Sequence, residues 1–172
     1  RTHPERKDYK TQLVDICQRT FDRGGNLVIP SFAVGRTQEL LFLFREIKEE
    51  KLIKNHDNFP VWVDSPLSVA ATNIYDGGME DYYDDETLDL ISKGINVLKF
   101  PDLRLAVTTD ESCAINFDKN SKVIISSSGM CEAGRIRHHL KHNLWKPENT
   151  ILFVGYQSEG TLGRKLLNGA KE

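Results

Sequence analysis

Three segments of this sequence place a serine five to seven residues before an arginine, and a glycine directly precedes each arginine. They are Ser31 with Gly35-Arg36, Ser128 with Gly134-Arg135, and Ser158 with Gly163-Arg164. Glycine lets the backbone approach a ligand closely, and arginine grips phosphate oxygens in pairs. Each segment lies between an expected strand and an expected helix, where the unpaired N–H groups of a helix N-terminus attract anions. The segments therefore indicate a surface for successive phosphates of a polymer.

A second interpretation of these segments stays open on the residues alone. Each glycine serves the tight turn between a strand and a helix, and each arginine lies along its helix as an ion-pair partner. A single Gly-Arg pair would favour this structural interpretation, whereas three pairs at equivalent places bring the phosphate interpretation level with it.

Other chemical motifs are missing from the sequence. It has no GxGxxG after a strand and no GxxxxGK[ST] loop, so it lacks the signatures of a dinucleotide site and of a P-loop. His138 and His142 share a helix face, but the glutamate of an HExxH zinc helix is absent between them. No GxSxG elbow and no Cys/His pair points to covalent catalysis. We therefore predict no catalytic residue and no metal ligand in this chain.

Apolar runs predict five strands that alternate with helices. The expected strands are residues 26–30, 61–63, 95–99, 122–126 and 150–154. The expected helices are 8–21, 37–54, one starting at Ser65-Pro66, one through Ile136, Leu140 and Leu144, and one around Leu162 to Leu167. Strands that are apolar throughout and separated by helices are typical of a parallel sheet covered on both faces. The prediction is a three-layer, Rossmann-like α/β domain with a mainly parallel sheet of about five strands, and with residues 76–89 as an exposed excursion.

Composition fits one globular domain over residues 1–172. The chain is 39% hydrophobic and 28% charged, with a net charge of −2, and no apolar run reaches the length of a membrane span. Three cysteines without CxxC spacing argue against a disulfide framework and for a reducing compartment, so we expect a cytoplasmic protein. Because the chain opens with Arg1 rather than Met, we expect it to be a piece of a longer protein.

Four blocks of this sequence resemble the β-CASP domain of metallo-β-lactamase-fold nucleases. The blocks are residues 24–41, 64–67, 127–135 and 155–164, and they occur in the family's order. The group includes the RNA-cleaving subunit of the polyadenylation machinery, its archaeal relatives and bacterial ribonucleases of the RNase J type.

The resemblance implies that the chain is a lobe inserted into a metallo-β-lactamase fold. The zinc-ligand motif HxHxDH would then precede Arg1, and the later family histidines would follow Glu172. Two zinc ions are expected in the full-length enzyme, which hydrolyses RNA phosphodiester bonds, and none in this fragment, which is expected to be inactive alone. The implied partners are single-stranded RNA and the metallo-β-lactamase domain of the same chain, with no membrane partner. An inserted lobe also implies that the two chain ends lie near one another.

The matched blocks imply which residues line the cleft and bind nucleic acid or phosphate. They are Ser31, Gly35, Arg36, Ser65, Ser127, Ser128, Gly129, Met130, Gly134, Arg135, Gln157, Gly160, Thr161 and Arg164. The three arginines are expected to be exposed and to contribute little to stability, although Arg36 has Glu39 and Asp64 as alternative partners. Two other functions remain open: the same lobe in a DNA-processing member of the superfamily, and an α/β module that binds only a small nucleotide or a protein.

Overall fold

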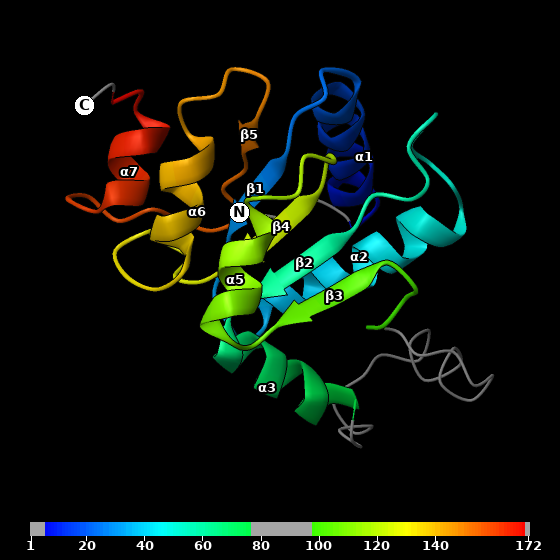
Figure 1. Ribbon diagram of the computed structural model, residues 1–172, viewed down its shortest axis with the longest axis horizontal. Helices are drawn as coiled ribbons and strands as arrows, with labels where there is room; N and C mark the ends of the chain where they lie inside the picture. Colours follow the sequence, from blue (N-terminus) through cyan, green and yellow to red (C-terminus); the bar gives the residue numbers. More distant parts are fainter. Residues whose placement is uncertain (1–5, 77–97, 171–172) are drawn as a thin grey trace.

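The computed structural model describes residues 6–76 and 98–170, and its centre is a five-stranded parallel sheet. The strands lie in the order β3-β2-β4-β1-β5, and every described pairing is parallel (Figure 1). Their bounds are β1 Leu27–Pro30, β2 Val61–Asp64, β3 Leu103–Ala106, β4 Val123–Ser126 and β5 Thr150–Ile151. The predicted α/β class with a parallel sheet is confirmed.

The register of the strands aligns the last residues of β1, β2, β3 and β4 with one another across the sheet. Pro30 and Asp64 both pair with Ser126, and Ala106 pairs with Asp64. The carboxyl ends of β1, β2, β3 and β4 therefore form one edge of the sheet, and the chain leaves β5 toward the same edge. In open parallel sheets, ligands bind beyond this edge.

Alternate strand residues serve two separate cores. Leu27 and Ile29 of β1 face helices α1 (Arg6–Asp22) and α2 (Arg36–Glu49), together with Val69 of α3 (Pro66–Asp76). Val28 between them faces α5 (Thr109–Ile115), α6 (Ile136–Asn143) and α7 (Leu162–Leu167) on the other side (Figure 1). This period of two explains why the strands are apolar throughout, since both of their faces are covered.

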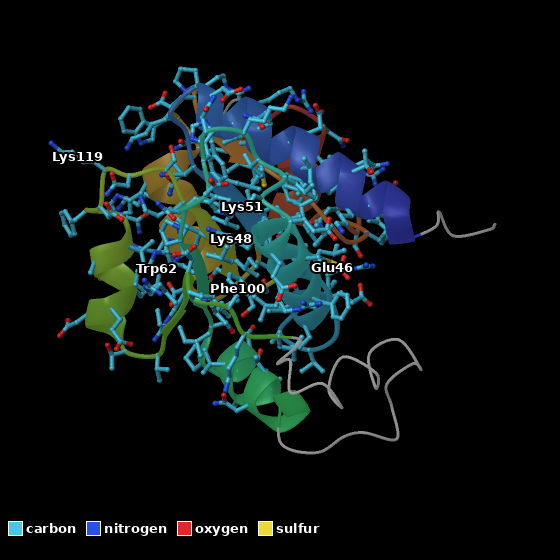
Figure 2. All side chains as sticks on the ribbon, turned by 90° about the vertical axis from the view of Figure 1, so that its right-hand side faces the viewer. Glu46, Lys48, Lys51, Trp62, Phe100 and Lys119 are labelled. Atoms are coloured by element: carbon cyan, nitrogen blue, oxygen red, sulfur yellow. The ribbon has the colours of Figure 1, made fainter. Side chains whose placement is uncertain are left out.

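At the opposite edge of the sheet, Lys48 of α2 binds residues that lie just before the starts of β2 and β3. Its ammonium group lies 2.8 Å from Asp102 Oδ2, donates to the carbonyl oxygen of Phe59, and sits 3.6 Å from the centre of the Phe59 ring. Lys48 is labelled near the centre of the view in Figure 2, and its side chain is only 7% exposed. Burial lowers the pKa of Lys48, and its hydrogen bond with Asp102 opposes that shift. The end of α2 is thus tied to the starts of β2 and β3.

The third strand lies later than predicted. We expected residues 95–99, but Leu98 and Lys99 are outside any strand, residues 95–97 lie outside the described part, and β3 is Leu103–Ala106. Leu98 is buried in the α1/α2 core from a loop, so its apolar character reflects loop packing. Among the described strands, β3 lies at the edge of the sheet, pairs only with β2 and carries an exposed Arg104, which weakens its sequence signal.

Two further elements differ from the prediction, and two predictions fall outside the described residues. The fifth strand is shorter than predicted, and α5 was not predicted. The predicted excursion at 76–89 lies outside the described residues after Asp76, as do the chain ends. All three cysteines are free. Among the described helices, none combines the length and the apolar character needed to cross a bilayer.

Candidate nucleic-acid interface

The predicted site residues follow four strands that are neighbours in the sheet. After β1 come Ser31, Gly35 and Arg36; after β2, Ser65; after β4, Ser127, Ser128, Gly129, Met130, Gly134 and Arg135; after β5, Gln157, Gly160, Thr161 and Arg164. Because β2, β4, β1 and β5 lie side by side, their following loops adjoin at one edge (Figure 1). The structure therefore gathers the predicted residues, while their binding to nucleic acid stays a prediction.

Serine hydroxyls join these loops to one another. Ser127 Oγ donates to Ser65 Oγ at 2.6 Å, which links the loops after β4 and β2. Ser31 Oγ accepts from Thr37 Oγ1 at 3.1 Å and so links the end of β1 to the first turn of α2. Ser31 and Ser65 are buried, whereas Ser127 and Ser128 are partly exposed. The first two serines therefore shape the edge, and the latter two are available at its surface.

The loop after β4 turns back on itself at Gly134. The N–H of Ser128 donates to Ala133 O at 3.0 Å, and that of Ile136 donates to Ser127 O at 3.1 Å. Gly134 has φ of +83°, and a Cβ there would come 2.5 Å from Ser127 O. Only glycine suits this conformation and this contact. The Gly of this Gly-Arg pair is thus explained by the turn.

Gln157 lies beneath the loops after β4 and β5. It is 1% exposed, and its Nε2 donates to Gly129 O at 2.9 Å and to Gly155 O at 3.1 Å. A Cβ on Gly163 would fall 1.8 Å from Gln157 Oε1, so a larger residue there would collide with the amide. Gln157 therefore acts from below the surface by holding two loops together.

The loop after β5 ends in the N-cap of α7. Thr161 Oγ1 accepts from the N–H of Arg164 at 3.2 Å and donates to Ser158 O at 2.6 Å. Gly160, just before this cap, has φ of +82°. Arg164 is partly exposed, and its Nη1 reaches Gln157 O at 3.3 Å.

The three predicted arginines have different surroundings. Arg36 begins α2 and pairs with Glu39 at 2.7 Å, in an ion pair whose two side chains are 42% and 63% exposed. Arg135 precedes α6, pairs with Asp64 Oδ1 at 2.7 Å and donates to Val107 O at 2.6 Å. Asp64 thus takes Arg135 as its partner instead of Arg36. Arg135 differs from the expected exposed arginine, because its side chain is 23% exposed and its partner is a fully buried carboxylate. We therefore expect Arg135, unlike Arg36, to contribute to stability.

Asp64, at the end of β2, is 0% exposed and accepts hydrogen bonds from three side chains. Its Oδ1 accepts from Arg135, while its Oδ2 accepts from Ser112 Oγ and, at 2.5 Å, from His139 Nε2. Burial alone would raise the pKa of Asp64, but the hydrogen bonds from His139, Ser112 and Arg135 outweigh it and lower the pKa. The carboxylate therefore stays ionised and ties α5 and α6 to β2.

A chain of amide side chains fixes the tautomer of His139. Asn26 and Asn149 both donate to Asn143 Oδ1 at 3.1 Å, and Asn143 Nδ2 donates to Asn116 Oδ1 at 3.1 Å. This leaves Asn116 Nδ2 to donate to His139 Nδ1, also at 3.1 Å. Since Nδ1 accepts from Asn116, Nε2 carries the ring proton that is donated to Asp64.

Sequence analysis missed Ser112 and His139 as parts of this site. The residues lie 48 and 75 positions from Asp64, so no local spacing joins them to it. Asp64 itself could have predicted such partners, because an acidic residue at the end of a buried strand requires polar groups around its carboxylate.

His138 and His142 lie on the same face of α6. The rings of His138 and His142 lie 4.6 Å apart between centroids, and burial together with His142 lowers the pKa of His138. Across residues 6–76 and 98–170, no three His, Cys, Asp or Glu side chains gather as a metal site would require.

Comparisons with known proteins identify the same domain. The family model described as Beta-Casp domain matches residues 37–166. Ribonuclease TTHA0252 of Thermus thermophilus is 31% identical over 97% of this chain, and an RNase J-like protein of Methanocaldococcus jannaschii is 35% identical over 98%. Transcription termination factor FttA of M. jannaschii is 34% identical over 98%. The chain spans only 37%, 37% and 26% of the lengths of these relatives.

The unequal surroundings of the arginines predict unequal losses of stability. Arg135→Ala leaves the buried Asp64 charge without its cationic partner, so we expect the free energy of unfolding to fall by about 3 kcal/mol. Arg36→Ala removes an exposed pair and is expected to cost at most about 1 kcal/mol. Urea unfolding of both variants measures the difference. Equal losses would contradict the assignment of Arg135 to the buried network.

The lowered pKa of Asp64 predicts a loss of stability in acid. Because the folded-state pKa lies below the ordinary value of 3.8, the carboxylate stabilises the fold above that value, and this contribution is lost as the pH falls through the folded-state pKa. Asp64→Asn should therefore have a smaller free energy of unfolding than the wild type at pH 6, and the difference between the two should narrow as the pH falls below 3.8. Urea midpoints across this range test the prediction, and a gap independent of pH would refute it.

Proposed function

The chain belongs to the β-CASP family, and on that basis we propose that it is the nucleic-acid-binding lobe of a metallo-β-lactamase-fold ribonuclease. The observation that carries the proposal is the gathering of four loops at the carboxyl edge of the sheet, with Arg36 and Arg164 among them. RNA is favoured over DNA as the substrate because two of the relatives are named as ribonucleases. This lobe would hold an RNA strand across the cleft toward the rest of the enzyme.

Arg36 and Arg164 are the groups proposed to contact phosphate. The ion pair of Arg36 with Glu39 is exposed, so a phosphate can replace the carboxylate at small cost. Arg36 also begins the 14-residue helix α2, whose N-terminus adds positive potential at this edge. Arg164 is partly exposed. The described hydrogen bond of its guanidinium group goes to the backbone carbonyl of Gln157. Arg135 is proposed to orient the loop after β4.

The hydrolytic chemistry is proposed to reside outside this chain. In the full-length enzyme, two zinc ions would supply an activated hydroxide and stabilise the developing charge on the phosphate. The described residues do not fit such a centre, because they contain no set of three suitable ligands. The contribution of this lobe is to bind and orient the strand. Its three free cysteines agree with the proposed cytoplasmic location.

This division of labour predicts that the full-length protein cleaves single-stranded RNA, whereas the isolated chain does not. Single-stranded DNA of the same sequence and free mononucleotides serve as the comparison ligands in a fluorescence polarisation titration, followed by a cleavage assay. Tighter binding of the full-length protein to DNA would favour a DNA-processing enzyme. Binding to mononucleotides alone would favour a small-nucleotide module, and metal-dependent cleavage by the isolated chain would overturn the proposal.

Arg36 and Arg164 are expected to act mainly through phosphate. In the full-length protein, Arg36→Ala and Arg164→Ala should each weaken RNA binding and reduce the slope of log K against log salt by about one phosphate contact. Lys119→Ala is the matched control, because Lys119 is exposed on the loop that leads into the start of β4 (Figure 2). Equal effects at Lys119 would indicate nonspecific charge attraction, and unchanged slopes for both arginines would remove them from the site.

A further inference from the structure

Phe32 is an exposed aromatic residue in the middle of the candidate interface. It follows Ser31 at the end of β1, the strand that lies between β4 and β5 in the sheet. It lies in the loop two residues after the last residue of β1, and the residue is 46% exposed although phenylalanine is among the residues most often buried. The sequence-based site did not include it.

Two glycines form a seat for the Phe32 ring. A Cβ placed on Gly129 would come 3.1 Å from both Cδ2 and Cε2 of the ring, and one on Gly155 would come 3.3 Å from Cε2. The ring therefore rests against the backbones of the loops after β4 and β5 while the rest of it remains accessible to solvent. Thr37 Oγ1 also donates to Phe32 O at 2.7 Å, which holds the backbone of this residue. The ring is thus positioned before any ligand arrives.

We propose that the exposed part of the Phe32 ring stacks against an unpaired base of the bound RNA, an inference that rests on the proposed function. Stacking on an aromatic ring accepts any base, because every base has a π-face. Arg36 begins α2 directly after the loop that contains Phe32, and Arg164 lies in the first turn of α7, which follows the loop after β5. The proposed phosphate contacts and base contact therefore come from adjoining segments. The substrate class is single-stranded RNA, since a paired base has no free face to offer at this position.

Other exposed apolar side chains at this edge are less suited to the role. Val34, Leu67 and Val107 are aliphatic and have no π-face. Tyr156 is aromatic, but it is 71% exposed against 46% for Phe32, so more of its freedom must be lost when a base stacks on it. Among the described residues at this edge, Phe32 therefore combines exposure with a ring that already packs against the protein.

The test compares Phe32 variants of the full-length protein on intact and abasic RNA. Phe32→Leu keeps an apolar side chain on the two glycines but removes the aromatic face, so we expect about tenfold weaker binding with unchanged thermal unfolding. Phe32→Tyr should restore the affinity. For the wild type, one abasic position along the oligonucleotide should cause a similar loss, and at that position Phe32→Leu should add nothing further. Phe117→Ala, an 81% exposed aromatic near the start of β4, is the matched control and should change nothing.

Two results would overturn the inference while leaving the proposed function intact. If Phe32→Leu binds RNA normally, or if it weakens intact and abasic RNA equally at every position, the ring does not stack on a base. The second pattern would instead indicate that Phe32 packs against another part of the protein. Failure of the wild type to bind RNA at all would overturn the proposed function itself.

Discussion

The candidate interface depends on one buried charge, the carboxylate of Asp64. A charge without exposure to water is tolerated only when it is paired and hydrogen-bonded, and Asp64 has Arg135, Ser112 and His139 as partners. Ser112 lies in α5, whereas Arg135 is the N-cap residue of α6 and His139 lies within that helix. All three are distant from Asp64 in sequence. The requirement to satisfy Asp64 therefore fixes both helices against the end of β2, and with them the loop that runs from β4 to α6.

The two edges of the sheet are held by different chemistry. At the edge where strands begin, Lys48 and the amides of Asn26 and Asn143 join strand starts to helix ends. At the carboxyl edge, short hydroxyl contacts and glycines pack four loops together, which leaves Arg36 and Phe32 partly exposed on a braced surface. A binding surface built in this way loses little freedom when a ligand arrives, and such preorganisation favours affinity.

How much was predictable depends on how local each signal was. The strands around Val28 and Ile124 were predicted nearly to the residue, because burial on both faces gives an unbroken apolar run. β3 was misplaced because an edge strand needs no such apolar run. α5 was missed because Asp110 and Glu111 in its first turn stabilise the helix N-terminus and add nothing to an apolar pattern. The positions of the strand ends were enough to predict that the site residues lie at one edge of the sheet. The pairing of Arg135 with Asp64 could not be predicted in this way, because it joins positions 71 residues apart.

Strand order explains why three similar Gly-Arg pairs have different surroundings. The loop after β4 adjoins the end of β2, which carries Asp64, so Arg135 lies within reach of that carboxylate. β1 and β5 lie one and two strands further away, and the arginines that follow them find only an exposed glutamate or a backbone carbonyl. The structural interpretation of the motif therefore accounts for Arg135, because the neighbouring strand β2 ends in a buried carboxylate. The phosphate interpretation is proposed for Arg36 and Arg164, which lie beyond the reach of Asp64.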